Sequence, residues 1–314
     1  AVMTKFLTLC LTLGLLTACN HIPPISDAAL DKLASQLRAD VVHLVAKYPQ
    51  RSHANPTQLA QMARELQEKI PHAQLQAYEV EGETYYNVVA RFEPQDAAAK
   101  KQSILVIGAH YDTAAGLPGA DDNTSGVAAL LALAQKLSTA SLSRPVELVA
   151  YSLEEPPYFR TQHMGSAVHA KALAAAQTPV AAMLSLECIG YFSDAPQSQT
   201  YPISVLEWLY PSTGNFIAVI GSLSDILTVR KVKNNLQNSD LIPVESLAAP
   251  ASIEGVDFSD HLNYQALGIP AVMITDTAFF RNARYHTEQD TPETLDYPRM
   301  ARVVEAVYGL VMNW

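Results

Sequence analysis

The stretch SILVIGAHYD, residues 103–112, decides the fold. Its first six residues form an apolar run that is typical of a strand buried on both faces of a sheet. The run leads straight into His110-Tyr111-Asp112, so an imidazole and a carboxylate follow the strand. In sheets of this type, ligands bind beyond the carboxyl ends of the strands. The stretch therefore predicts a buried strand and the edge of the sheet at which the chemistry takes place.

Strand and helix patterns continue on both sides of this stretch. Towards the C-terminus we expect helices at 124–137, 163–176, 223–237 and 298–313, and strands at 146–153, 180–186, 215–221 and 270–275. Towards the N-terminus, helices at 27–48 and 56–70 follow the capping residues Ser26 and Asn55 and precede strands at 74–80 and 84–92. This alternation predicts an α/β fold, a three-layer α/β/α sandwich with a mixed, mostly parallel central sheet. No linker interrupts residues 27–314, which we interpret as a single domain.

The bulk composition is that of a globular protein with an acidic surface. Hydrophobic residues make up 49% of the 314 residues, enough to bury a full core. The formal net charge is −10, and no run of basic residues offsets it. Such a surface repels phosphate backbones, so we expect no nucleic-acid partner. Composition leaves the oligomeric state open.

The N-terminal segment has the features of an export signal. Lys5 precedes an uncharged apolar run over residues 6–18, which is too short to span a bilayer. The run ends in LTAC, residues 16–19, and is similar there to a bacterial lipobox. We expect a signal peptide over 1–18, a lipid on Cys19 and a tether over 19–26; the alternative is a buried N-terminal helix with an incidental cysteine. Asn20 favours the outer membrane, so the expected location is the cell envelope, lipid-anchored and facing the periplasm.

Acidic residues and histidines recur where the expected strands end. Each of them alone has a commoner structural role, such as an N-cap or a hydrogen-bonded loop residue. Together they supply the carboxylates and imidazoles that divalent ions take from separate elements, and two ions need a shared carboxylate. The sequence therefore predicts a two-metal site with a carboxylate base, Glu154, beside it. The five expected ligands are His110, Asp122, Glu155, Glu187 and His286.

These segments resemble a family of cocatalytic zinc exopeptidases that contains bacterial leucyl aminopeptidase, glutamate carboxypeptidase II and glutaminyl cyclase. The resemblance extends from about residue 85 to the C-terminus. The family's strand-His-x-Asp motif falls on His110 and Asp112, and its Gly-Ala-Asp-Asp-x-x-Ser-Gly stretch falls on residues 119–126. Its Glu-Glu pair falls on residues 154–155, and its His-Thr-x-x-Asp-Thr motif on residues 286–291.

The resemblance implies a metallo-exopeptidase that binds a peptide substrate and two Zn2+ per chain. One zinc is implied at Asp122, Glu155 and His286, and the other at Asp122, Glu187 and His110. The resemblance also implies that the peptide bond after Asp122 is cis.

Two further roles follow from the same resemblance. Asp112 is implied to orient His110 through the remaining ring N–H. Glu154 is implied to take a proton from the zinc-bound water and deliver it to the leaving nitrogen.

The polarity of cleavage depends on two conflicting signals. Aminopeptidases of the family typically carry Asp where this chain has Glu187, and Glu there favours a carboxypeptidase or dipeptidase. The longer segment 268–297 most resembles aminopeptidases, and we weigh it above the single change and predict an aminopeptidase. Two other hypotheses are a one-zinc acyltransferase like glutaminyl cyclase and a non-enzymatic binding protein on the same scaffold. The full set of ligands argues against both.

Three residues are candidates for binding substrate: His261, Arg281 and Tyr285. His261 either lines a pocket or is a hydrogen-bonded loop residue. Arg281 either binds a substrate carboxylate or pairs with acidic side chains. The aromatic residues of the loop 196–211 either form a wall of a side-chain pocket or anchor the loop.

Overall fold

The computed structural model describes residues 25–114 and 116–314. The expected signal peptide over 1–18, the lipidated Cys19 and most of the tether over 19–26 lie outside the described residues and stay predictions. Within the described part, none of the helices combines the length and the apolar character that crossing a membrane requires.

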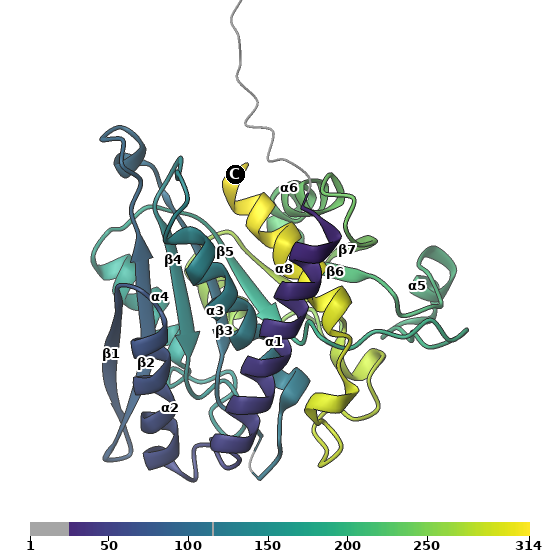
Figure 1. The fold of residues 1–314 in the computed structure, drawn as a ribbon, viewed down its shortest axis with the longest axis horizontal. Coiled ribbons are helices and arrows are strands. Elements are labelled where there is room, and N and C mark those ends of the chain that lie inside the picture. Colours follow the sequence, from purple (N-terminus) through teal and green to yellow (C-terminus); the bar gives the residue numbers. More distant parts are fainter. Residues whose placement is uncertain (1–24, 115) are drawn as a thin grey trace, which may run out of the picture.

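The strands form one mixed sheet in the order β1-β2-β4-β3-β5-β8-β6-β7 (Figure 1). Pairing is parallel from β4 through β3 and β5 to β8 and between β6 and β7, and antiparallel elsewhere. The mixed, mostly parallel sheet expected from the sequence is therefore confirmed. The strands are β1 Ala73–Val80, β2 Glu83–Phe92, β3 Ile104–His110, β4 Val146–Tyr151, β5 Val180–Glu187, β6 Ile217–Ser222, β7 Val244–Ala249 and β8 Ala271–Thr275.

Helices cover both faces of the sheet, which gives the three layers. They are α1 Asp27–Lys47, α2 Pro56–Lys69, α3 Gly126–Leu137, α4 Gly165–Ala175, α5 Ser204–Leu209, α6 Ile226–Gln237, α7 His261–Gln265 and α8 Tyr297–Met312. Leu105 and Ile107 of β3 belong to a core shared with α1, α2, α3, α6 and α8. Their neighbours Ile104 and Val106 belong to a second core shared with α4 and α7. Alternate side chains of one strand thus enter opposite cores, because successive Cβ atoms point to opposite faces.

Local sequence signals explain the first two helices. The Ser26 hydroxyl accepts the backbone N–H of Ala29 at the start of α1, and the Asn55 side chain accepts that of Gln58 at the start of α2. Sequence analysis did not anticipate β7, α5 and α7. The two helices are very short, and β7 is an edge strand of partly buried residues without an apolar run.

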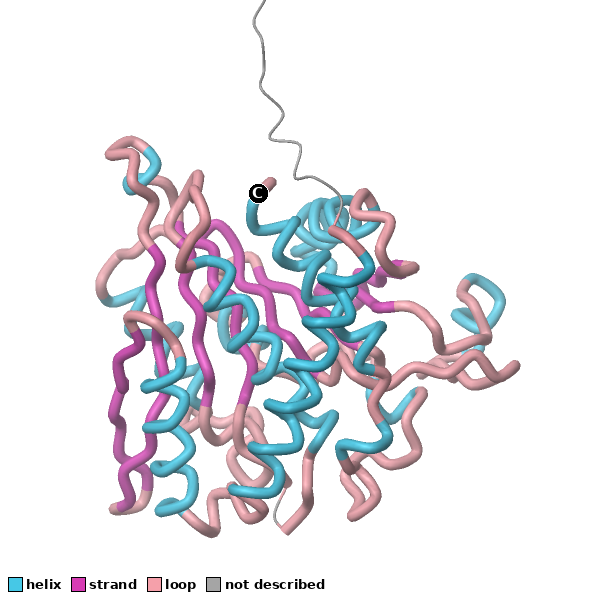
Figure 2. The backbone as a smooth tube through the Cα atoms, in the orientation of Figure 1, coloured by secondary structure: helices cyan, strands magenta, loops and turns pink. Residues whose placement is uncertain are grey.

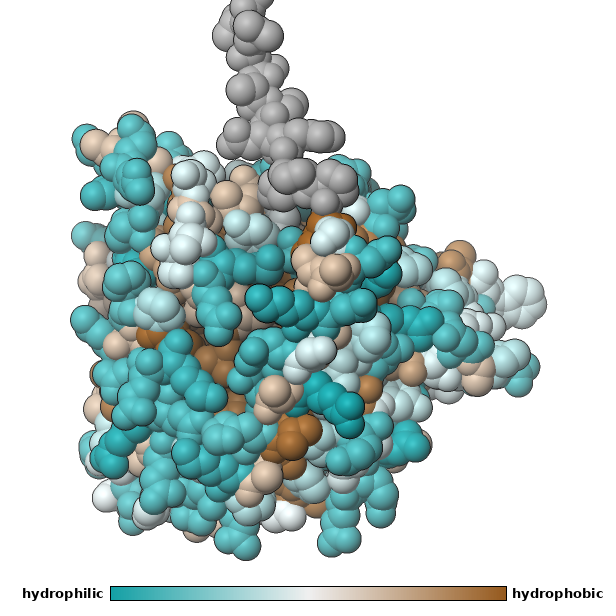
Figure 3. Space-filling view, in the orientation of Figure 1, coloured by the Kyte–Doolittle hydropathy of each residue, from teal (hydrophilic) through white to brown (hydrophobic). Residues whose placement is uncertain are grey.

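The loops that follow β3 and β4 lie together at the bottom of Figure 2, and the chain that follows β5 runs from the carboxyl end of that strand towards α5 at the right. The loops after β3 and β4 mark the edge that the parallel pairing assigns to the carboxyl ends of the strands. At the far end of the sheet, α5 and its flanking loops project from the body of the molecule, as the space-filling view shows at the right (Figure 3). The loops at this edge position the candidate site, and the projecting segment with α5 forms a wall beside it.

Candidate active site

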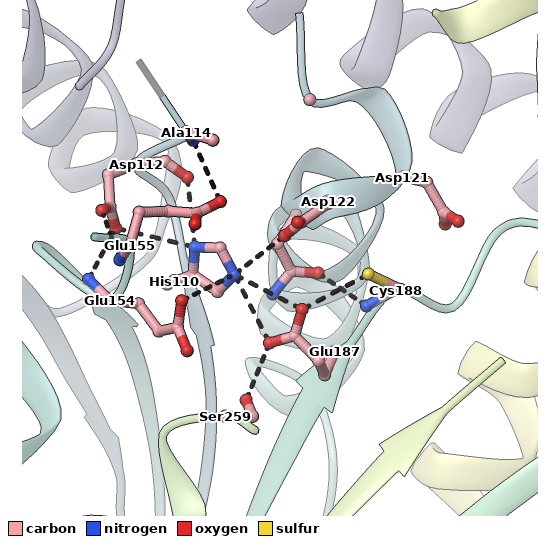
Figure 4. Close-up of polar contacts among 12 residues, drawn as sticks. His110, Asp112, Ala114, Asp121, Asp122, Glu154, Glu155, Glu187, Cys188 and Ser259 are labelled. Carbon is pink, nitrogen blue, oxygen red and sulfur yellow. Dashed lines mark hydrogen bonds and ion pairs between the residues drawn. The ribbon is translucent and has the colours of Figure 1, made fainter. Parts of the chain in front are cut away.

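His110 is the last residue of β3, and its ring is fully buried. Its Nδ1 lies 3.1 Å from the carbonyl oxygen of Asp112, which can only accept, so Nδ1 carries a proton. The opposite nitrogen, Nε2, faces two carboxylates: Asp122 Oδ1 at 3.2 Å and Glu187 Oε2 at 3.4 Å (Figure 4). The hydrogen bond of one nitrogen therefore aims the other at the acidic cluster, as in metal-binding histidines.

Asp122 lies between the two predicted histidines. Its Oδ1 is 3.2 Å from His110 Nε2, and its Oδ2 is 2.9 Å from His286 Nε2. Oδ2 is buried and makes no properly oriented hydrogen bond despite that short distance. The Asp122–Asn123 peptide bond is cis, as the resemblance implied. Each oxygen of one carboxylate thus faces a different histidine, which is the arrangement of a ligand shared by two ions.

The ligand atoms form two groups that share this carboxylate. In each group the atoms lie within 4.8 Å of one another: His110, Asp122 and Glu187 in one, and Asp122, Glu155 and His286 in the other. These are the two sets that the sequence predicted. Imidazole and carboxylate donors in groups of three fit zinc, which takes nitrogen and oxygen ligands and leaves a position open in catalytic sites.

The pKa values of these residues show an excess of buried negative charge. Burial acts to raise the pKa of Asp122, but the nearby His110 and His286 rings hold it well below its usual range. Burial and the charge of Asp122 raise the pKa of Glu155 to about 7. Burial acts to lower the pKa of His286, yet its close contacts with Asp122 and Glu155 raise it to about 10. A divalent cation would relieve this crowding.

Glu154 belongs to neither group and stands beside them. Its Oε2 is 3.9 Å from Nε2 of His110, and the side chain lines an open cleft together with Glu155 and His286. Burial raises the pKa of Glu154 well above its usual value, and the charges of Glu187 and Glu155 add to the effect against the opposing charge of His110. A carboxyl group with a raised pKa, next to the ligands and facing the cleft, is suited to accept and return a proton.

Asp112 connects the ends of β3 and β4. Its two carboxylate oxygens each accept a backbone N–H, one from Glu154 and one from Glu155, both at 3.1 Å. Its Oδ1 is 3.6 Å from Nδ1 of His110, farther than the backbone oxygen of the same residue. The carboxylate thus holds the Glu154–Glu155 pair, and the main chain of Asp112 does most of the orienting of His110.

The structure separates the three candidates for substrate binding. Tyr285 lines the cleft, and its ring stacks on that of His286 with centroids 3.9 Å apart. His261 is fully buried, and its Nε2 lies 2.9 Å from the Val256 carbonyl oxygen. It does not line the cleft. The hydrogen-bonded alternative for His261 is the one that the structure supports.

Arg281 does not face the cleft, so the expectation that it binds substrate is wrong on geometric grounds. Its guanidinium donates to Gln199 Oε1 at 2.8 Å and to the Phe216 carbonyl oxygen at 2.9 Å. The group lies against the Phe216 ring, and Gly214 packs directly on its aliphatic part. Among the described residues it forms no ion pair, so surface pairing was also the wrong alternative. Its Nε and Nη1 atoms donate to the loops around it, and its Nη2 atom is buried without a hydrogen-bond partner among the described residues.

Arg51 is a residue of the site that sequence analysis missed. It is 1% exposed and donates to the carbonyl oxygens of Tyr111 and Gly119 and to the Thr124 hydroxyl. Burial lowers its pKa to about 10, although the charge of Asp290 opposes the shift. Arg51 thereby ties the end of β3 to the loop that carries Asp122. No sequence signal marks it, because an arginine between two helices usually lies on the surface.

Asp290 and Ser259 support individual ligands. The two oxygens of Asp290 accept the backbone N–H groups of Asp121 and Asp122, at 2.9 and 3.1 Å. The Ser259 hydroxyl donates to Glu187 Oε2 at 2.7 Å. Asp290 lies in the His-Thr-x-x-Asp-Thr motif, so its place in the motif was the available signal. Ser259 had none.

Comparison with known proteins agrees with the family resemblance of the motifs. Residues 87–311 match the pattern of Peptidase family M28. Uncharacterized protein YfbL of Escherichia coli (strain K12) is 49% identical over 242 residues, covering 74% of this chain and 72% of that protein. Leucine aminopeptidase 1 of Ajellomyces dermatitidis is 25% identical over 223 residues, covering 66% of this chain and 51% of that protein. The chain thus spans about half the length of the fungal enzyme.

Solved structures share the fold. The LapA aminopeptidase of Legionella pneumophila has a TM-score of 0.67 at 20% identity, over 90% of this chain and 72% of that chain. A glutaminyl cyclase of Tannerella forsythia has a TM-score of 0.63 at 19% identity, over 90% of this chain and 98% of that chain. At these identities the likeness shows the architecture, and the chemistry must be argued from the side chains.

Proposed function

Because this chain belongs to peptidase family M28 and is a metallo-exopeptidase, we propose that it releases single residues from the N-terminus of peptides with two Zn2+ per chain. The observation that carries the proposal is Asp122, whose two oxygens serve two groups of ligands at once. A site for one ion needs only one of these groups.

The residues of the chain divide the work between them. His110 and Glu187 would hold one zinc, Glu155 and His286 the other, and Asp122 both. When bound, zinc acidifies a water molecule towards a pKa of about 7 and polarises the carbonyl group of the scissile bond. Glu154, beside the ligands and in the cleft, accepts the proton of the attacking water and returns it to the leaving nitrogen.

The charges of the cleft support cleavage at the amino end. Glu154, Glu155 and Glu254 line it, and no lysine or arginine does so in the described part of the chain. Arg160, stacked near the rim on Phe159, is engaged by Asp257 at 2.6 Å. A substrate's free ammonium group thus meets carboxylates, whereas a free carboxylate meets no available guanidinium.

The test compares substrates and counts metal ions. We expect turnover of a leucyl anilide with a free amine, no turnover of an N-acylated dipeptide with a free carboxylate, and about two zinc ions per chain by elemental analysis. Turnover of only the acylated dipeptide would make Glu187 the better guide and the enzyme a carboxypeptidase or dipeptidase. One zinc per chain with cyclisation of an N-terminal glutamine would instead identify an acyltransferase like glutaminyl cyclase.

A further inference from the structure

A second recess opens behind the metal cleft. The two share Phe258, Phe279 and Tyr285 as a common wall, and the metal ligand Glu187 lies at the inner end of the recess. About 780 Å³ of empty space lies within it, open solvent included. Its floor is a face of β8, β6 and β7, and the projecting segment that includes α5 supplies the opposite wall. A substrate bound at the metals would have this space beside it.

The pairing of the strands shows how far the floor of the recess extends from the metal ligand Glu187. Glu187 of β5 pairs with Thr275 of β8, Thr275 with Ala218 of β6, and Ala218 with Glu245 of β7. Residues paired across strands share one face of a sheet, and neighbouring strands lie about 4.8 Å apart. Glu245 therefore stands on the floor three strands away from the metal ligand, at roughly 14 Å. Only a long side chain of a substrate held at the metals would bring its end near Glu245.

Glu245 is the charged group at the far end of this recess, whereas Glu187 and Glu254, which also line it, lie towards the metal cleft. Tyr201 and Tyr210 also line it there, with ring centroids 5.8 Å apart. Burial, and then the charge of Glu245, raise the pKa of both phenols, so the carboxylate lies near enough to act on both of them. Their hydroxyls donate to the carbonyl oxygens of Pro211 and Ser246, so neither hydroxyl is needed by Glu245.

The Glu245 carboxylate has no hydrogen-bond or ion-pair partner in residues 25–114 and 116–314. None of the residues that line the recess is a lysine, an arginine or a histidine. The nearby Arg281 lies behind Gln199 and Phe216 and donates to both of them. A partly buried carboxylate near two aromatic rings, without a cationic neighbour among the described residues, is a site that attracts a cation from outside the chain.

We propose that this recess receives the side chain of the substrate's N-terminal residue and that Glu245 selects a cationic one, arginine or lysine. The inference rests on the proposed aminopeptidase function and specifies its substrate class. The aliphatic stem of such a side chain packs on Phe279 and Met273, while its charged end reaches Glu245 and the faces of the two tyrosine rings. A leucine side chain fits the apolar part and leaves Glu245 unpaired.

The test follows kcat/KM for arginyl, lysyl, citrullyl and leucyl anilides. Citrulline matches arginine in size and shape but is uncharged. In Glu245→Gln we expect a loss of about 10- to 100-fold on the two cationic substrates, the range for one charge-assisted contact. On the citrullyl and leucyl substrates the change should stay within about threefold, and Glu245→Asp should keep part of the preference. The control is Glu207→Gln on α5, an exposed glutamate outside the recess, which should alter none of the four.

Each outcome is decisive. Equal losses on all four substrates, or an unchanged arginyl-to-citrullyl ratio in Glu245→Gln, would overturn the inference while leaving the aminopeptidase intact. So would a wild-type enzyme that prefers leucine to arginine. Absence of turnover on all four substrates by the zinc-loaded wild type would refute the proposed function itself. Leucyl turnover and metal content in each variant show that the variant is folded.

Discussion

Asp122 and Glu154 show how neighbouring acids acquire different tasks from their surroundings. Asp122 is held between His110 and His286, which keep it ionised and able to bind cations. Glu154 lies 3.9 Å from His110 alone, and burial together with the charges of Glu187 and Glu155 outweighs that histidine and favours the protonated form. Two groups of the same chemistry thus differ in pKa because one is paired and the other is crowded. That difference is the basis for separating ligand from base.

Replacing Glu154 by glutamine tests this separation. The amide keeps the size of the side chain and lies outside both ligand groups, so zinc content should stay at the wild-type level. It cannot accept a proton, so kcat should fall by at least about 100-fold, the usual contribution of a positioned base. Elemental analysis and steady-state kinetics on the same preparation give both numbers. Loss of zinc together with activity would show that Glu154 is a ligand and that the roles within the Glu154–Glu155 pair are reversed.

At the scale of elements, buried ion pairs and hydrogen bonds attach the N-terminal helices to the rest of the fold. Arg51, between α1 and α2, bonds to the loop of Asp122. Glu65 of α2 accepts bonds from Lys47 and Tyr48 at the end of α1, at 2.6 and 2.5 Å. The Glu65 side chain is 10% exposed, whereas Lys47 is 52% exposed. The contact between α1 and α2 therefore depends on an ion pair that is partly open to solvent.

Glu65 should make this contact sensitive to acid. Burial acts to raise its pKa, but bonds from Lys47, Tyr48 and His43 outweigh burial and lower it to about 2. A folded-state pKa below the ordinary 4.5 stabilises the protein above pH 4.5, and this contribution is lost as the pH falls towards 2. Glu65→Gln should lower the free energy of unfolding by about 1–2 kcal/mol at pH 7, after allowance for solvent screening at the exposed partners.

Urea unfolding at pH 7 and at pH 2.5 measures this effect. The gap between wild type and Glu65→Gln should shrink at the lower pH, because the unfolded wild-type chain then binds a proton at Glu65 and most of the carboxylate's contribution to stability is lost. Glu68→Gln, an exposed neighbour on α2, should match the wild type at both values. A gap that is the same at both pH values would mean that the loss comes from packing rather than from charge.

Across the whole molecule, negative charge is concentrated at the buried edge of the sheet. The formal net charge is −10. Part of it lies in the site, where the carboxylates outnumber the two histidines. Asp122, Glu154, Glu155 and Glu187 are all less than 10% exposed. Buried like charges at this spacing destabilise a fold unless cations accompany them. Metal binding should therefore contribute to the stability of the protein as well as to its catalysis.

Removal of metal by a chelator should lower Tm by about 5–10 °C, which corresponds to roughly 3–4 kcal/mol of binding linkage. The effect should be larger at pH 8 than at pH 5.5. The raised pKa of Glu155, about 7, and that of His286, about 10, mean that the metal-free chain loses stability as the pH rises through these values. The same rise frees the ligands of protons and strengthens metal binding. Scanning calorimetry with and without chelator measures both, and an unchanged Tm at pH 8 would contradict the proposed centre.

The sequence by itself determined the fold class and the candidate ligands. Apolar runs such as residues 103–108 indicate buried strands because they leave no face for water, and His110 was assigned to the sheet edge because it follows such a run. Cap residues determined where α1 and α2 begin. These are local properties, which depend on a few neighbouring residues. The ligand sets additionally needed the family's motif order, which is also written in the sequence.

Only the tertiary structure decided how distant segments meet. The bonds of Arg51 to Gly119 and of Ser259 to Glu187 join residues 68 and 72 positions apart. Arg281 was expected in the cleft and points into the supporting loops instead, because the direction of a side chain in an irregular loop depends on the backbone around it. Glu245 came into the recess through strand order and register, in which a shift of one residue would turn it to the opposite face. Contacts of this kind arise from packing between elements, and no short stretch of sequence contains them.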